Sequence, residues 1–457
     1  MRRRLILCAC CLWGIVADVW AQPNVSLQQL LQSPELKHAV VGISVKSMKD
    51  GRTIVEYEGD KSLQPASVCK ILPTALALKT KGSDFRYITK VMTTGKIEDG
   101  ILQGDVVIRS QGDPCPDSRY FREYVFLDRL VEIIRQRGIR KIQGCIRVEG
   151  GERAVVPGSW LWEDISNYYG AAYFPFNYRD NAYYLGFRTG QAGEKAELLF
   201  VEPEQPGISF VSEVVAGTGN VDDAWIFGGP YSRVMNVVGS LPKKRQLYRI
   251  KGAMHHPVSC FLKELEEKLK KCDIVLEKEL LPVAEEKELA VFTSPELKEI
   301  VRVTNKKSVN LFAEALGNLV TVGDFPVRCC SMLHEIGVDT SGIVLRDACG
   351  LSVVNTVPAA VFSDFLLWAY KELGWDFVAS LPLAGTDAGL NAYLAADPVL
   401  KNKLRAKTGS FTGVRCLSGY LTKKNGEVLV FTVLVNHFIC SPVLLQKRIG
   451  SFLATLV

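Results

Sequence analysis

Residues 65–79 read PASVCKILPTALALK, and this stretch carries the strongest chemical signal in the chain. The apolar residues after position 70 predict a helix over about residues 67–79, with a kink at Pro73. Because residues three apart share one face of a helix, the amine of Lys70 can reach the hydroxyl of Ser67. A serine needs a base before it can act as a nucleophile, and a lysine with a lowered pKa can be that base. The stretch therefore predicts a serine nucleophile paired with a lysine.

Taken alone, a serine and a lysine in this spacing are a weak motif. A chain of ordinary composition contains on the order of one or two such pairs by chance. Ser240 and Lys243 form a second pair here, but Pro242 lies between them and no helical periodicity surrounds them. A helix N-cap at Ser67 with an exposed lysine would explain the first pair equally well, so further motifs are needed.

Two further motifs follow in the chain. Ser308-Val309-Asn310 lies at the start of a predicted helix, and Lys407-Thr408-Gly409 comes shortly before a strand predicted from about Arg415. Separately they indicate only a helix cap and a turn. A side chain at Gly409 would block a substrate lying along a strand edge. Together with the first pair, and in this order, they are typical of penicillin-binding proteins and class A β-lactamases.

The spacing of the motifs indicates a large insertion. Ser308 follows Ser67 by 241 residues, and Lys407 follows Ser308 by 99. A compact serine-lysine hydrolase needs far fewer residues in the first gap, so about 200 are extra. From about residue 85 to 281, short predicted strands alternate with glycine turns, which is typical of a β-rich block.

With these motifs the sequence resembles the class C low-molecular-mass penicillin-binding proteins, which are D-alanyl-D-alanine carboxypeptidase/endopeptidases. The resemblance covers nearly the whole chain after its first 21 residues. The segments that carry it are residues 65–72, 111–114, 162–171, 179–181, 305–314, 383–387, 405–409 and 417–420. The chain departs from the family pattern at Val309, Ala348, Cys349 and Ala388, which spares the catalytic positions and concerns loop geometry and substrate preference.

The resemblance implies an α/β (α+β) fold of the penicillin-binding transpeptidase/β-lactamase-like type, with an antiparallel sheet flanked by helices and a large β-rich insertion. Residues 22–82 and 287–457 would form the two parts of the transpeptidase-like domain. Residues 83–286 would form the inserted β-rich subdomain or subdomains.

The resemblance also implies roles for the motif residues. Ser67 would be the acylated nucleophile and Lys70 the acylation base, although the identity of the base in this superfamily is disputed. Ser308 and Lys407 would relay a proton to the leaving D-alanine.

Four further positions are implied to bind the substrate: Asn310, Thr408, Gly409 and Ser410. The amide of Asn310 would hold a substrate amide, and the hydroxyls of Thr408 and Ser410 would bind the terminal carboxylate. The backbone N–H groups of Ser67 and Ser410 would form the oxyanion hole. No metal and no cofactor is expected.

The predicted function is a serine-type D-alanyl-D-alanine carboxypeptidase/endopeptidase acting on peptidoglycan stem peptides through a Ser67 acyl-enzyme. β-Lactams would acylate the same serine because their strained amide mimics the scissile bond. The sequence leaves open whether carboxypeptidase or endopeptidase activity dominates. Two alternatives also stay open: a β-lactamase, and a non-catalytic peptidoglycan-binding protein. The large insert disfavours the first, and the intact motifs disfavour the second.

The N-terminus has the pattern of a signal peptide over residues 1–21. Arg2, Arg3 and Arg4 precede a 13-residue apolar run, 5–17, and Val19-Trp20-Ala21 then resembles a small-residue cleavage site. The run is too short to span a bilayer, so we expect an exported, periplasmic protein with no transmembrane anchor after cleavage. A net charge of +6 on 457 residues is too weak for a dedicated nucleic-acid binder. The 13 cysteines contain no C-x-x-C pair after position 21, which excludes a zinc ribbon.

Overall fold

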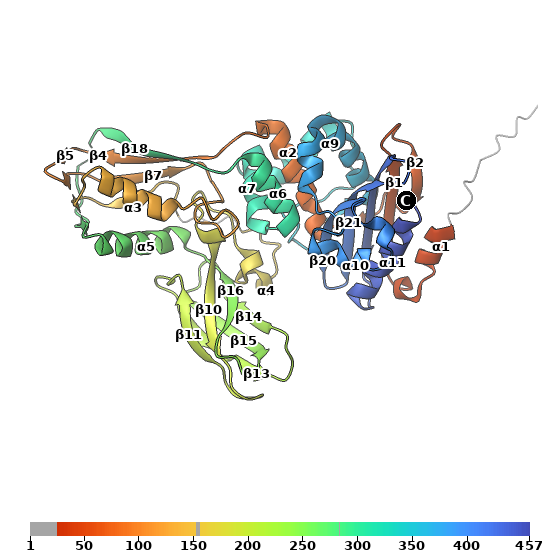
Figure 1. Cartoon of the computed structure of the whole chain (residues 1–457), viewed down its shortest axis with the longest axis horizontal. Coiled ribbons are helices and arrows are strands. Elements are labelled where there is room, and N and C mark those ends of the chain that lie inside the picture. The colour runs from red at the N-terminus through yellow and green to blue at the C-terminus, as the bar shows by residue number, and fades with distance from the viewer. Residues whose placement is uncertain (1–24, 152–155, 283) are drawn as a thin grey trace, which may run out of the picture.

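A computed structural model describes residues 25–151, 156–282 and 284–457. The predicted signal peptide lies outside these residues. None of the helices in the described part is long and apolar enough to cross a membrane. Figure 1 shows a helix-flanked sheet with the C-terminus beside it, and two elongated lobes built from the middle of the chain.

The central sheet joins the two ends of the chain. It has five antiparallel strands in the order β2-β1-β22-β21-β20. Its first strands come from the N-terminal segment and the others from the last 54 residues, and β1 pairs with β22 along its whole length. The strand bounds are β1 Val40–Ser47, β2 Thr53–Tyr57, β20 Leu404–Phe411, β21 Val414–Thr422 and β22 Val428–Asn436.

Helices cover both faces of this sheet (Figure 1). Along β22, Val430 and Leu434 pack in one core with α2, α6, α7 and α9, whereas Phe431 and Val433 pack in a second core with α10 and α11. Successive side chains of a strand point to opposite faces of the sheet, so a continuous apolar strand such as β22 is buried on both faces. The helix bounds are α1 Val25–Leu31, α2 Ile71–Lys81, α6 Leu297–Lys307, α7 Asn310–Val320, α8 Phe325–Glu335, α9 Ala359–Ser380, α10 Asn391–Leu394 and α11 Pro442–Ala454.

The helix predicted at residues 67–79 is divided into two types. Ala66–Lys70 is a 3-10 helix, and α2 continues from it over Ile71–Lys81. Pro73 lies in the first turn of α2, where a missing N–H is tolerated, so the predicted kink at Pro73 is wrong. The change of helix type at residues 70–71 takes its place. The Lys407-Thr408-Gly409 motif lies inside β20, not in a turn before a strand.

The middle of the chain forms the two lobes. In the first lobe, helices α3 and α5 share a core with the four-stranded sheets β18-β4-β7-β9 and β17-β8-β6-β5. Its elements are α3 Phe126–Gln136, α5 Pro257–Lys271, β4 Ile88–Thr94, β5 Ile97–Glu98, β6 Ile101–Leu102, β7 Val106–Ser110, β8 Lys141–Ile142, β9 Ile146–Val148, β17 Val275–Leu276 and β18 Glu286–Thr293.

The second lobe is almost entirely β-structure, with one core between the sheet β11-β10-β16 and the sheet of β12, β13, β14 and β15. Short helices α4 Trp162–Ile165 and 3-10 Tyr168–Gly170 connect it to the rest of the molecule. Its strands are β10 Ala182–Arg188, β11 Glu197–Glu202, β12 Ser209–Ser212, β13 Val215–Gly217, β14 Asp223–Phe227, β15 Val234–Pro242 and β16 Tyr248–Ala253.

The pairing of β18 bears on where the inserted block ends. β18 is antiparallel to β4, from Glu286 opposite Thr94 to Thr293 opposite Ile88. The chain therefore stays in a sheet of the first lobe for eight residues beginning at position 286. We propose that the inserted block extends to about Thr293, and that the second part of the transpeptidase-like domain begins with α6.

Candidate active site

The first motif lies in a tight turn that two glycines enclose. Ala66, next to Ser67, has a φ of 47°, in the left-handed region that non-glycine residues rarely adopt. A Cβ at Gly350 would lie 2.0 Å from the Ala66 carbonyl oxygen, and a Cβ at Gly409 would lie 2.2 Å from the Pro65 carbonyl oxygen. The missing side chain of Gly409 thus makes room for the nucleophile turn, a reason different from the substrate clearance that the sequence suggested.

Lys70 is fully buried and forms a hydrogen bond with Ser67. Its Nζ donates to the Ser67 Oγ at 2.9 Å and to the carbonyl oxygen of Cys349 at 2.6 Å. Burial lowers the pKa of Lys70 below that of an ordinary lysine, while the electrostatic influence of Cys349 and Asp347 opposes this shift. The arrangement is that of a hydroxyl with a proton acceptor within hydrogen-bond reach.

A lysine–serine hydrogen bond also joins the third motif to the second. The buried Lys407 Nζ donates to the Ser308 Oγ at 2.9 Å and to the Thr408 carbonyl oxygen at 2.7 Å. Ser308, predicted at a helix start, is the left-handed residue between α6 and α7, with a φ of 56°. Burial, assisted by the charge of Lys70, lowers the pKa of Lys407 well below the ordinary lysine value.

Asn310 ties the second motif to the inserted block. It is the first residue of α7, and its Nδ2 donates to the backbone carbonyl of Tyr169 at 2.7 Å. The side-chain donor that the sequence assigned to a substrate amide is therefore engaged by the 3-10 turn of the insert. This contact places the Tyr168–Gly170 turn at the rim of the site.

Residues of the first two motifs, and Ser410 directly after the third, line one cavity of about 470 Å³, within the usual range for small-ligand sites. The lining hydroxyls and amide are those of Ser67, Ser308, Asn310 and Ser410, and the amines of Lys70 and Lys407 lie behind two of these hydroxyls. The end of β20 and the loop after α8 add further wall, including Phe411 and Thr412. The second lobe and its connection supply six more lining residues: Leu161, Glu163, Asp164, Tyr168, Tyr169 and Trp225. The first five lie in the quoted 162–171 segment or directly before it, whereas no sequence pattern pointed to Trp225.

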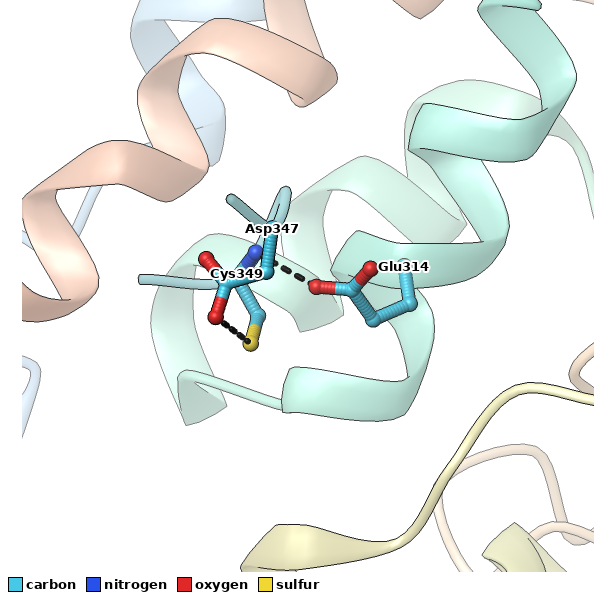
Figure 2. Close-up of side chains that lie close together, drawn as sticks. All are labelled: Glu314, Asp347 and Cys349. Atoms are coloured by element: carbon cyan, nitrogen blue, oxygen red, sulfur yellow. Dashed lines mark hydrogen bonds between the residues drawn. The ribbon is translucent and has the colours of Figure 1, made fainter. Parts of the chain in front are cut away.

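The loop after α8 presents the second acceptor for Lys70, and two carboxylates hold that loop: Asp347, which is buried, and Glu314, which is half-buried (Figure 2). The Glu314 Oε1 accepts from the backbone N–H groups of Ala348 and Cys349, at 2.9 and 2.8 Å. Asp347 accepts four hydrogen bonds from nitrogen donors and a fifth from the Cys349 thiol, at 3.7 Å. The nitrogen donors are Trp160 Nε1, the backbone N–H groups of Gly350 and Ser352, and Asn355 Nδ2, at 2.6–2.8 Å.

Glu314, Asp347 and Cys349 bring three potential metal ligands within 4.8 Å of one another. Their surroundings do not fit a cation, because N–H donors already occupy both Asp347 oxygens and one oxygen of Glu314. Burial raises the pKa of Glu314 to about 7 and that of the Cys349 thiol well above its usual value, which disfavours the charged forms that bind metals. We interpret the cluster as the support of the loop.

The sequence is similar to those of known carboxypeptidases along most of its length. The model of the D-Ala-D-Ala carboxypeptidase 3 (S13) family matches residues 24–451. D-alanyl-D-alanine carboxypeptidase DacB of Haemophilus influenzae is 25% identical, over 91% of this chain and 89% of the relative. D-alanyl-D-alanine carboxypeptidase of an Actinomadura species is 27% identical, over 94% and 84%.

The fold has close counterparts among solved structures. The crystal structure of penicillin binding protein 4 from Haemophilus influenzae has a TM-score of 0.77 at 22% identity, covering 92% of this chain and 97% of that one. The predicted penicillin-binding fold and the resemblance to class C penicillin-binding proteins are confirmed. The chain belongs to the D-Ala-D-Ala carboxypeptidase 3 (S13) family.

Proposed function

We propose that this protein is a serine-type DD-peptidase that cleaves D-alanyl-D-alanine bonds of peptidoglycan stem peptides through an acyl-enzyme on Ser67. One observation carries the proposal: a fully buried lysine amine lies 2.9 Å from the hydroxyl of Ser67, and Ser67 lines a cavity together with Ser308, Asn310 and Ser410. The family and the named carboxypeptidase relatives support the same reaction.

In the acylation step, the neutral Lys70 amine takes the proton of the Ser67 hydroxyl as its oxygen attacks the carbonyl carbon of the penultimate D-alanine. The C–O ester bond forms and the C–N bond of the terminal D-alanine breaks. The leaving amine receives a proton through Ser308 from Lys407, which lie 2.9 Å apart. Water then attacks the ester carbon, and the C–O bond to Ser67 breaks as Lys70 returns its proton to the serine oxygen. The proton that the water gives up restores the Lys407 ammonium, and the shortened peptide leaves as a carboxylate.

Other groups of the motifs would hold the substrate. We assign the oxyanion to the backbone N–H groups of Ser67 and Ser410. The hydroxyls of Thr408 and Ser410 would bind the terminal carboxylate, next to the positive charge of Lys407. Asn310, anchored through its Nδ2 to Tyr169, would contact a substrate amide. Gly409 would contribute by letting β20 approach the nucleophile turn.

β-Lactams are proposed to acylate Ser67 by the same chemistry. Penicillin binding protein 4 of Haemophilus influenzae, 21% identical here, has been solved complexed with a β-lactam. We also propose that residues 1–21 are a cleaved signal peptide and that the mature protein acts in the periplasm, where its polymeric substrate lies.

The decisive test measures released D-alanine. Wild-type protein is expected to release D-alanine from a soluble pentapeptide ending in D-Ala-D-Ala, and prior incubation with benzylpenicillin is expected to stop the release. Rapid turnover of a chromogenic cephalosporin without D-alanine release would favour the β-lactamase instead. A folded protein that binds peptidoglycan, with neither activity, would favour the binding protein.

The rate of Ser67 acylation is expected to rise with pH. Lys70 acts as a base only when neutral, and its neutral fraction grows as pH rises through its pKa. Because burial lowers that pKa, the rate of benzylpenicillin acylation should reach its plateau below the ordinary lysine pKa of about 10.4. Stopped-flow acylation across this pH range measures the profile.

Burial lowers the pKa of both Lys70 and Lys407, so either lysine could produce the rising limb. The variant Lys407→Gln shows which of the two titrations the profile reports. A rising limb that persists in this variant, at a reduced rate, supports Lys70 as the base. Its disappearance would assign the titration to Lys407.

A further inference from the structure

A second cavity adjoins the active-site cavity on the side of the second lobe. It measures about 260 Å³ and shares Tyr168, Tyr169 and Trp225 with the first. Its remaining wall comes from Asn167, Asp222, β14 and β16, and it includes the apolar residues Ala224 and Ile250. We call this the lobe cavity, and its polar residues are Asn167, Asp222, Asp223, Arg249 and Lys251.

The two walls of the lobe cavity are held rigidly together. The Asn167 side chain donates to the backbone carbonyl of Ile226 at 3.4 Å and accepts from its N–H at 3.3 Å. Asn167 also forms a β-bridge with Gly252, next to Lys251. The turn that carries Tyr168 is thus fixed to both β14 and β16, so a ligand would meet a preformed site.

Aromatic rings and hydrogen-bonding groups stand together in this cavity. Tyr168 is 43% exposed and Trp225 is 36% exposed. The Lys251 ammonium lies 4.4 Å from the centroid of the Tyr168 ring. Large aromatic side chains kept exposed beside a cavity mark a binding surface.

The balance of charge indicates what would bind there. Two carboxylates, Asp222 and Asp223, face the same cavity as two cations, Arg249 and Lys251. Such a wall does not favour a strongly charged ligand of either sign. A sugar fits it, because a pyranose has an apolar C–H face that packs on an aromatic ring and a rim of hydroxyl and amide groups that bond to carboxylates, guanidinium and ammonium.

We propose that the lobe cavity binds the amino-sugar chain of the same polymer whose stem peptide occupies the active-site cavity. The inference rests on the proposed function, since that function makes a glycan-linked peptide the substrate. The rings of Tyr168 and Trp225 line both cavities, so a single ligand that packs on these rings would extend from one cavity to the other. The second lobe then selects polymeric peptidoglycan fragments over free peptides.

Lys251→Ala provides the test, because Lys251 lines the lobe cavity and not the active-site cavity. Arg249→Ala is the second variant, and Lys195→Ala is the control, since Lys195 is an exposed lysine of the same lobe paired with Glu213. Each is placed on Ser67→Ala protein. Calorimetry then measures the Kd for a disaccharide-linked pentapeptide and for the same pentapeptide without sugar.

Binding of the disaccharide-linked peptide is expected to weaken by about tenfold in Lys251→Ala and Arg249→Ala, and to stay within about twofold in the control. Binding of the sugar-free peptide should stay within about twofold in all three. Equal weakening for both ligands would assign the cavity to the peptide and overturn the proposal, as would no weakening for either. D-alanine release by protein with Ser67 intact tests the proposed function separately, because the binding measurement requires no catalysis.

Discussion

Replacing Ser67 with alanine is expected to abolish the covalent adduct with benzylpenicillin and the release of D-alanine. The Ser67 Oγ is the atom that Lys70 contacts at 2.9 Å on the cavity wall, so its loss removes the acceptor of the acyl group. The rate should fall by about 10⁴-fold or more, in line with other serine hydrolases that lose their nucleophile. Intact-protein mass spectrometry after incubation with benzylpenicillin measures the adduct directly.

Ser240→Ala is the matched control. Ser240 belongs to the second serine-lysine pair of the sequence, but it lies in strand β15 and outside the active-site cavity. Its variant should retain one penicillin per chain. An adduct that persists in Ser67→Ala and disappears in Ser240→Ala would reverse the assignment of the nucleophile.

Replacing Asp347 with asparagine is expected to damage both stability and acylation. The Asp347 Oδ1 accepts from the Gly350 N–H and Asn355 Nδ2, and its Oδ2 accepts from Trp160 Nε1 and the Ser352 N–H. An asparagine keeps one oxygen and presents an NH₂ group to two donors. The free energy of unfolding should fall by about 3 kcal/mol, the scale of buried donors left without a partner.

The same substitution should slow acylation, because the Asp347 loop carries the Cys349 carbonyl that lies 2.6 Å from Lys70. Displacing that carbonyl moves the base relative to Ser67, and a misplacement of about 1 Å costs on the order of 100-fold in rate. Chemical denaturation measures the first effect. The acylation rate of the folded variant, at a temperature well below its melting point, measures the second.

Glu314→Gln is the control for the Asp347 prediction. The Glu314 Oε1 accepts both backbone hydrogen bonds, and an amide oxygen can replace it. Burial raises the pKa of Glu314 to about 7, so the loss of its charge near neutral pH is a small change. This variant should lose less than about 1 kcal/mol. A larger loss in Glu314→Gln than in Asp347→Asn would contradict the view that Asp347 is the main support of the loop.

Local spacing accounts for what the sequence predicted well. Ser67 and Lys70 lie one helical turn apart, and that distance holds whether the turn is 3-10 or α, so their contact survives the change of helix type. The nearly continuous apolar run of β22, Val428–Asn436, likewise predicts a strand buried on both faces. Both features depend on residues a few positions apart in the chain, because the local backbone conformation sets the distance and the direction between their side chains.

Tertiary structure decided the rest. The Cys349 carbonyl that binds Lys70 comes from a residue 279 positions away, and a backbone oxygen leaves no mark in a sequence. Gly409 makes room for the Pro65 carbonyl, a reason visible only when β20 lies against the nucleophile turn. Trp225 reaches the cavity because Asn167 fastens its strand to the Tyr168–Gly170 turn. The sequence by itself thus determined the class of chemistry and predicts the reacting groups. It can do so because the residues within each motif are a few positions apart and stay close together in the fold. Packing between distant segments determined three features: the Cys349 carbonyl that accepts from Lys70, the close approach of β20 to Pro65 at Gly409, and the cavity wall at Trp225. These contacts exist only after the chain has folded.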